Sequence, residues 1–217
     1  LVAIGFFMWV FPGQYNVLDS GYASLDTLFT LAPWIFLFLV PAVTMRMIAD
    51  EKKSGTMELL LTRPISDLQI VISKYLASLM LVLLALIPTL IYFFSIYHLG
   101  NPTGNIDVGG TIGSYTGLFF LAAIYAAIGI FASSLTSNQI IAFIIALLIA
   151  FFFYMGFDLL SGMWIFSSID TLVADLGINA HYRSMSRGVI DTRDIVYFIS
   201  VILVFIFLTK TIIQNRR

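Results

Sequence analysis

The chain has 217 residues, of which 60% are hydrophobic and 11% charged, and its mean hydropathy is +0.99. A soluble domain of this size could not cover so much apolar surface with so few charged side chains, and the apolar runs are continuous rather than alternating as in a β-barrel. The net charge of -1 provides no basic surface for nucleic acid, and the absence of cysteine excludes disulfides and thiolate metal sites. We therefore expect an all-α polytopic membrane protein.

Six spans are expected in a single transmembrane domain, 1–217, and the first of them only in part. The apolar run 1–11 is shorter than the roughly 20 residues that a span requires, so we expect it to be the outer end of span 1, with the start of that span preceding Leu1. Span 2 is expected at 28–48, where Pro33 and Pro41 predict kinks.

The sequence from Ser66 onward predicts the third span at 66–97. Ser66 is a favourable N-cap because Gln69 stands three residues later, as in a capping box. Pro88 predicts a bend inside this span.

Three further spans are expected at 111–134, 137–156 and 194–213, and Asp191 is a suitable cap for the last. Span 4 is rich in small residues, which permit close helix approach either between two copies or within one copy. These are Ala122, Ala123, Ala126, Ala127 and Gly129.

The distribution of lysine and arginine predicts the orientation, because cytoplasmic loops carry an excess of these residues. One side of the expected topology holds Arg46, Lys52, Lys53, Arg63, Lys74, Lys210, Arg216 and Arg217, and the other holds Arg183, Arg187 and Arg193. The segment between spans 2 and 3 is therefore expected in the cytoplasm. Both termini are expected there as well, in the cytoplasmic (inner) membrane of a cell.

The cytoplasmic segment from Met45 to Lys74 is the most highly charged part of the chain. Within it, "GTMELLLTRP" predicts a short helix with Glu58 in its first turn and Arg63 at its end, and Pro64 prevents its continuation. Its apolar side is formed by Met57, Leu60 and Leu61. Such a short helix needs a surface that covers its apolar side: either the lipid headgroups or a groove in a cytoplasmic partner.

The stretch "EKKSGTMELLLTRPISDLQIVISK" resembles the signature of type-2 ABC transporter permeases. The matching residues are Glu51, Gly55, Thr56, Glu58, Leu60, Leu61, Pro64 and Lys74. The resemblance implies that 50–63 is a coupling helix that docks into a separate ATP-binding subunit. The partner-binding residues would be Glu51, Gly55, Thr56, Met57, Glu58, Leu60, Leu61, Arg63 and Pro64. The loops and spans are most similar to the permease subunit of gliding-motility ABC transporters.

This resemblance implies a permease subunit of an ATP-driven exporter. The chain has no G-x-x-x-x-G-K-[S/T] phosphate loop and no catalytic residues that we identify, so ATP and magnesium would be bound by the partner subunit. Because the first, partial span and the other five enclose no obvious polar channel, we expect a dimer with a second copy or with a related permease. Spans without fixed charge point away from small ions and toward a lipid, polysaccharide or peptide-like cargo.

The segment 157–190 is expected on the outer side. Ile169, Leu172, Val173 and Leu176 follow helical spacing, with Ser168 as a possible cap and Gly177 as the helix end. This apolar face could simply pack on the outer ends of the spans. The resemblance instead implies re-entrant helices that close the outer end of the substrate path, with a helical break at Gly156–Ser167 and Asp158 within the outer gate.

The amides of "LTSNQ" stand at the cytoplasmic start of span 5. Ser137, Asn138 and Gln139 either cap that helix or make a second contact with the ATP-binding subunit.

Other functions have weaker support. His98 and His181 are the only histidines and are far apart in sequence, so no metal site is expected. An intramembrane enzyme or an ion-coupled transporter would require paired ionisable residues at membrane depth, and Asp158 is the only candidate. A membrane anchor or scaffold without its own transport path remains an alternative.

Overall fold

The structure is a computed structural model that describes residues 2–62, 64–163 and 169–215, apart from the side chains of Leu59 and Leu61. Every regular element within these ranges is a helix, which confirms the all-helical membrane class. The elements are α1 (Val2–Trp9), α2 (Val17–Ser20), α3 (Asp26–Thr44), α4 (Arg46–Ser54), α5 (Thr56–Leu61), α6 (Asp67–Leu86), the 3-10 turn η1 (Ile87–Thr89), α7 (Leu90–Leu99), α8 (Val108–Leu135), α9 (Gln139–Phe151), the π-helical segment η2 (Phe152–Gly156), α10 (Phe157–Ser161), α11 (Asp170–Ala174), α12 (Ile178–Ser186) and α13 (Thr192–Gln214).

Within the described residues, five helical stretches are long and apolar enough to cross a membrane. They are Asp26–Ser54, Asp67–Leu99, Val108–Leu135, Gln139–Ser161 and Thr192–Gln214. Each overlaps one of the five spans that the sequence contains in full. Helix α1 has 8 residues, so a sixth span that includes it stays a prediction.

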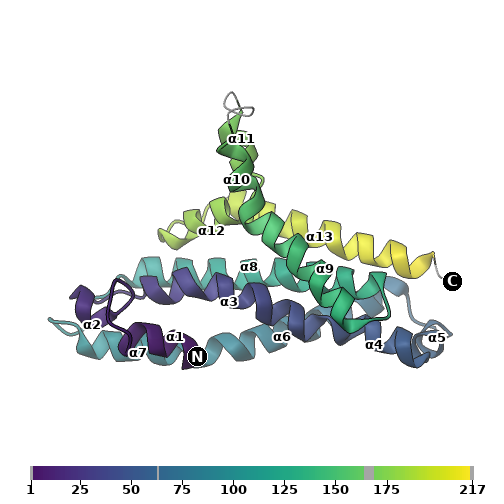
Figure 1. The fold of residues 1–217 in the computed structure, drawn as a ribbon, viewed down its shortest axis with the longest axis horizontal. Coiled ribbons are helices and arrows are strands. Elements are labelled where there is room, and N and C mark those ends of the chain that lie inside the picture. The colour runs from purple at the N-terminus through teal and green to yellow at the C-terminus, as the bar shows by residue number, and fades with distance from the viewer. Residues whose placement is uncertain (1, 63, 164–168, 216–217) are drawn as a thin grey trace.

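Helix α8 is the centre of the bundle, and α3, α6, α9, α12 and α13 all pack against it (Figure 1). In the most apolar 18-residue stretch of α8, 78% of the residues are buried, against 22% to 50% in the corresponding stretches of the other four spans. Its small residues are all buried within this single chain, as the fully enclosed Ala122, Ala126 and Ala127 show. Of the two arrangements that these residues allow, the structure therefore has close packing within one copy.

The closest approach to α8 is made by the end of α3. A Cβ atom placed on Gly129 would lie 2.8 Å from Cβ of Thr44, so only glycine fits at this contact. Thr44 in turn donates a hydrogen bond from Oγ1 to the carbonyl of Val40, at 2.9 Å. The Thr44 side chain, with its hydroxyl hydrogen directed back to its own helix, thus lies directly against the backbone of α8.

The prolines act differently in the two helices that contain them. Pro33 and Pro41 lie inside α3, and neither of them ends the helix before Thr44. At Pro88 the helix changes to the 3-10 turn η1, which separates α6 from α7 where the sequence predicts a bend. Thr89 donates from Oγ1 to the carbonyl of Leu86 at 2.6 Å, which supplies a partner for a backbone oxygen at this interruption.

The helical break predicted for Gly156–Ser167 does not begin at Gly156. The helix of span 5 continues from α9 through the π-helical segment η2 into α10, which ends only at Ser161. In η2 the backbone is π-helical, a wider turn that interrupts the α-helix without ending it. Part of the expected break, residues 164–168, lies outside the described residues.

The two ends of the bundle carry different structures. Helix α5 and the C-terminal end of α13 lie at one end of the long axis, and α2 lies at the other with the loop that follows α7 (Figure 1). Helices α10 and α11 pack against each other and rise away from the bundle (Figure 1). The chain then returns through α12, which packs on α8 and α13.

The contact between Gly129 and Thr44 generates a prediction. Gly129→Ala should lower the thermal unfolding midpoint of the purified protein, because overpacking at a close helix contact costs about 1–3 kcal/mol. Gly109→Ala is the matched control on the same helix: its added Cβ would find its nearest neighbour at an ordinary 3.5 Å. Equal midpoints for the two variants would show that α3 and α8 are not so tightly packed.

Candidate partner-docking site

The segment 50–63 is two helices rather than one. Helix α4 runs on to Ser54, and α5 starts at Thr56. Gly55 joins them with a φ of 72°, a left-handed conformation that glycine adopts at low cost. The hydroxyls of Ser54 and Thr56 meet across this turn at 2.8 Å. The sequence thus predicted the start of α5 at Gly55-Thr56 correctly, but α5 is not an isolated helix.

The apolar side of α5 is turned partly toward the protein itself. Met57 is 7% exposed and belongs to the main hydrophobic core, and Leu60 is half-buried against that core. The side chain of Leu61 and the whole of Arg63 lie outside the described residues. Met57 thus packs in the protein's own core, and its contact with a partner stays a prediction. The surface that α5 offers includes Thr56 and Glu58, which are exposed.

Helix α4 is joined to α8 through the hydroxyl of Ser133. Oγ of Ser133 accepts hydrogen bonds from the backbone N–H groups of Ile48 and Ala49, at 3.0 and 2.9 Å. The same hydroxyl donates to the carbonyl of Met45 at 2.8 Å. These N–H groups lie in the first turn of α4, where a helix lacks internal partners for its donors. Ser133 therefore serves as a buried cap supplied by another helix.

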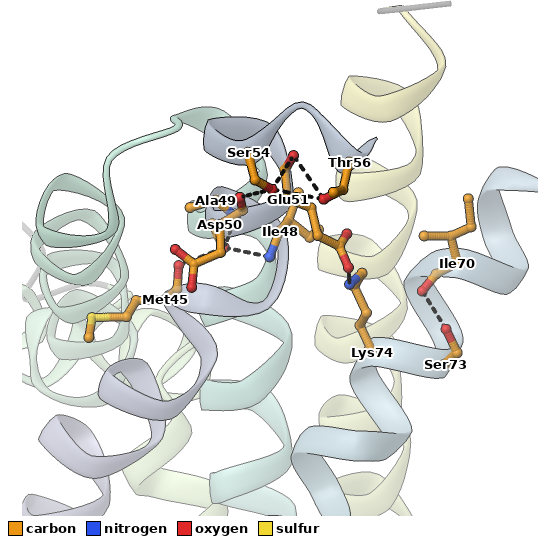
Figure 2. A network of polar contacts seen from close by, with 11 residues as sticks. Met45, Ile48, Ala49, Asp50, Glu51, Ser54, Thr56, Ile70, Ser73 and Lys74 are labelled. Atoms are coloured by element: carbon orange, nitrogen blue, oxygen red, sulfur yellow. Dashed lines mark hydrogen bonds and ion pairs between the residues drawn. The ribbon is translucent and has the colours of Figure 1, made fainter. Parts of the chain in front are cut away.

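Three consecutive charged residues extend this connection to other helices. Glu51 forms an ion pair with Lys74 of α6, with Oε1 and Nζ 2.5 Å apart (Figure 2). Lys52 donates to the backbone carbonyl of Ser134, the residue that follows the buried cap on α8. Asp50 accepts a hydrogen bond from the side-chain amide of Gln139, at the start of α9. The end of α4 is thus attached to three spans at once.

The start of α9 and the end of α4, which the sequence singled out separately, lie side by side. Asn138 caps α9 by accepting a hydrogen bond from the N–H of Ile140 at 2.9 Å, as expected of "LTSNQ". Gln139 contacts α4 instead, and Asp50, Glu51, Lys53, Ser54 and Gln139 line a hollow of about 440 Å³. This hollow lies at the exposed end of α4, beside the turn into α5.

Sequence reasoning did not identify the buried cap. Ser133 stands in a long apolar helix, and a serine there commonly bonds only to its own helix. Ser134 does so, with Oγ donating to the carbonyl of Phe131 at 2.7 Å. A pair of adjacent, fully buried serines at the end of span 4 was the one available signal.

The residues expected at an outer gate lie in two places: four of them lie in and around α11, and Asp158 lies in α10. The sequence predicted a helix up to Gly177, but α11 ends at Ala174, and Ser168 lies outside the described residues. The predicted apolar face does not pack on the spans, because Ile169, Leu172 and Leu176 are exposed and Val173 is half-buried.

Asp158 lies elsewhere, in α10. Its Oδ2 accepts a hydrogen bond from Nδ2 of Asn179 at 2.5 Å, and so connects the end of span 5 to α12. The carboxylate therefore has a structural partner in this conformation.

A polar cavity of about 320 Å³ opens between α3, α8, η2 and α12. Its walls include Trp34, Ser114, Tyr154, Asn179 and Arg183. Tyr182 also lines it and donates from its hydroxyl to the carbonyl of Phe29 at 2.7 Å. Burial raises the pKa of this phenol, so it stays a hydrogen-bond donor over the whole physiological range.

Metal chemistry finds no support in the described part of the chain. No group of three or more His, Asp or Glu side chains there is arranged to hold a metal ion. His181 instead contacts Asp194, and His98 packs against the ring of Tyr97 with 5.6 Å between ring centroids.

The ion pair between Glu51 and Lys74 can be tested by charge exchange. Glu51→Lys or Lys74→Glu alone should lower the thermal unfolding midpoint, because each places like charges together at a half-buried position. The double exchange should recover most of the loss, with a coupling energy of about 1 kcal/mol. The exposed Lys53 supplies the control variant Lys53→Glu, which should have little effect. Additive effects in the double variant would contradict the pairing.

Comparison with known proteins agrees with this geometry. Residues 17–214 match the family described as ABC-2 family transporter protein. No curated protein matches the chain. The family match covers nearly all of the described spans, including the α4–α5 segment and the start of α9. The chain belongs to the ABC-2 family of transporter proteins, as a membrane permease subunit whose partner is an ABC ATP-binding subunit.

Proposed function

We propose that the exposed ends of α4 and α5, together with the start of α9, form the surface on which the ATP-binding subunit docks. The observation that carries this proposal is the attachment of α4 to three other helices, α9, α6 and α8, through Asp50, Glu51 and Lys52. A force applied at the turn around Gly55 would pass directly to α6 and α8, because these contacts leave α4 little freedom to move alone. The hollow beside Gln139 offers a place for a partner side chain.

The proposed surface is more polar than the sequence alone suggested. Because Met57 is buried in the protein's own core, the partner would meet Thr56, Glu58 and the exposed Lys53 rather than a purely apolar helix face. Exposed polar and charged side chains at a protein interface favour correct orientation of the partner and fast association more than they increase affinity. Leu60, which is half-buried, would contribute the apolar contact closest to the rim.

In this proposal the permease works as a dimer, with a second copy or a related permease, in an exporter of the gliding-motility type. The dimer contact would not use the small residues of α8, since these are already buried within one copy. The mass of the purified complex tests the dimer, and surface movement of a deletion strain tests the gliding role. A complex with one permease copy, or unchanged movement, would exclude the respective assignment.

Docking can be tested at Leu60. Leu60→Asp should reduce co-purification of the ATP-binding subunit by at least tenfold, which corresponds to about 1.4 kcal/mol, because an unpaired carboxylate in a protein contact costs several times that amount. If the α4–α5 segment rested only on lipid headgroups, the subunit would bind as in the wild type, since an interfacial side chain can turn toward water.

A second variant separates docking from folding, because Leu60 also packs on the protein's own core. Glu58→Arg changes an exposed residue in the first turn of α5 and should also lower co-purification. Asp170→Arg makes the same change in the first turn of the short helix α11, at a distant site, and should leave it unchanged. If Glu58→Arg and Asp170→Arg both lost the ATP-binding subunit, the loss would reflect a general folding defect and not the docking surface.

The proposed orientation places α5 and both termini in the cytoplasm. The chain contains no cysteine, so single cysteines can be introduced without background labelling. A cysteine at Ser54 should react with a membrane-impermeant maleimide only from the cytoplasmic side, and a cysteine at Asn105 only from the outer side. Both residues are exposed. Labelling of the Asn105 variant from the cytoplasm would overturn the orientation and the docking proposal together.

A further inference from the structure

His181 stands where three segments of the outer half of the bundle meet. It belongs to α12, its Nδ1 lies 2.7 Å from Oδ1 of Asp194 in the first turn of α13, and its Nε2 lies 2.8 Å from the backbone carbonyl of Asp175. The imidazole also stacks on the ring of Tyr197, with 3.9 Å between centroids and an interplanar angle of 20°. The ring is therefore held by α13 on one side and by the turn after α11 on the other.

The two partners of the imidazole constrain its protons. The carbonyl of Asp175 only accepts hydrogen bonds, so Nε2 must carry a hydrogen. A second hydrogen is needed between Nδ1 and Oδ1 of Asp194, and it can be bonded to either of these two atoms. A neutral ring beside an ionised carboxylate has one hydrogen too few to make both bonds. The observed geometry consequently requires that the His181–Asp194 pair holds one additional proton.

The surroundings of the pair favour keeping this proton. The side chain of Asp194 is 7% exposed, and its Oδ2 is buried with no hydrogen-bond partner among the described residues. Loss of the proton would leave a negative charge there without a cationic neighbour in hydrogen-bond contact, which is costly at a buried site. The electron-rich face of Tyr197 also attracts an imidazolium.

The other titratable and charged groups near the pair are few. From α13 they are Tyr197 and the exposed Arg193, and from the turn after α11 the exposed carboxylate of Asp175. The charged residue of α12 itself is Arg183, which is exposed. The carboxylate of Asp194 is the one in direct contact with the ring.

We propose that His181, Asp194 and Tyr197 form a pH-sensitive clasp that holds the segment from α11 to α12 against the start of α13. Tyr197 takes part through its hydroxyl, which donates to the carbonyl of Leu176 at 2.6 Å. The clasp affects the polar cavity between α3, α8, η2 and α12, because α12 supplies Asn179 and Arg183 to the wall of that cavity. The exposed α11 is the part free to move when the clasp opens, since it packs mainly on α10.

The direction of the pH dependence follows from the proton count. The closed clasp binds one proton more than the open one, so acid favours closure and a rise in pH favours opening. A single proton changes the ratio of closed to open forms by at most about tenfold per pH unit. This inference does not depend on which ATP-binding subunit binds or where it docks.

The experiment is a spin-label distance measurement on the full chain with its ATP-binding subunit in lipid nanodiscs. Labels on cysteines at the exposed Leu172 of α11 and Val108 of α8 report the clasp, and labels at Val108 and Leu203 of α13 form a reference pair that does not cross it. The 108–172 distance distribution should broaden or lengthen reversibly between about pH 5.5 and pH 8, while the 108–203 distribution stays constant. An unchanged 108–172 distribution would overturn the proposal.

Variants distinguish the clasp from a general effect of pH. In Asp194→Asn the amide can donate to Nδ1 of a neutral ring that keeps hydrogen on Nε2, so both bonds survive and the 108–172 distribution should remain closed at high pH. His98→Gln removes the other histidine and should keep the wild-type transition. A wild-type transition in Asp194→Asn, or its loss in His98→Gln, would contradict the assignment to His181.

Discussion

The close approach of α3 to α8 at Gly129 is the contact on which the half of the structure that carries α4 and α5 depends. A glycine there lets Thr44 rest on the backbone of α8, and any larger residue would push the two helices apart. Ser133 follows four residues later on the same face of α8, one turn closer to its C-terminal end. Because the helices are already in contact at Gly129, the hydroxyl of Ser133 can reach the first turn of α4 and cap it.

This geometry changes the physical picture of the α4–α5 segment. A short helix of about two turns is unstable alone, so it must gain its order from contacts elsewhere. The sequence suggested that a partner or the lipid surface supplies them. The structure supplies many of them internally, through the buried Met57, the ion pair of Glu51 with Lys74 and the hydrogen bond from Lys52 to Ser134. A partner that docks there meets an ordered surface and loses less entropy on binding.

The opposite half of the bundle uses the same central helix with different chemistry. Gly113 permits α12 to approach α8 so closely that a Cβ atom there would lie 2.9 Å from Cα of Gly188. Polar side chains then complete the contacts, with Asn179 bonded to Asp158 and His181 to Asp194. Small residues on α8 thus set the positions of both α4 and α12, and hydrogen bonds select the orientation of each. The contacts of α4 include an ion pair between Glu51 and Lys74, whereas those of α12 include a histidine paired with a carboxylate.

The sequence by itself determined the membrane class, the five complete spans and the helix caps at Ser66, Asn138 and Asp191. These features depend on the apolar character of long runs and on hydrogen bonds between residues two to four positions apart, so a local pattern is sufficient to predict them. Only the tertiary structure decided that Met57 points inward, that the helix of span 5 continues through η2, and that Ser133 and His181 find their partners. Ser133 bonds to residues more than 80 positions away, and His181 bonds to a carboxylate on a different helix. Such contacts depend on how the helices pack around α8, and no local sequence pattern specifies that packing.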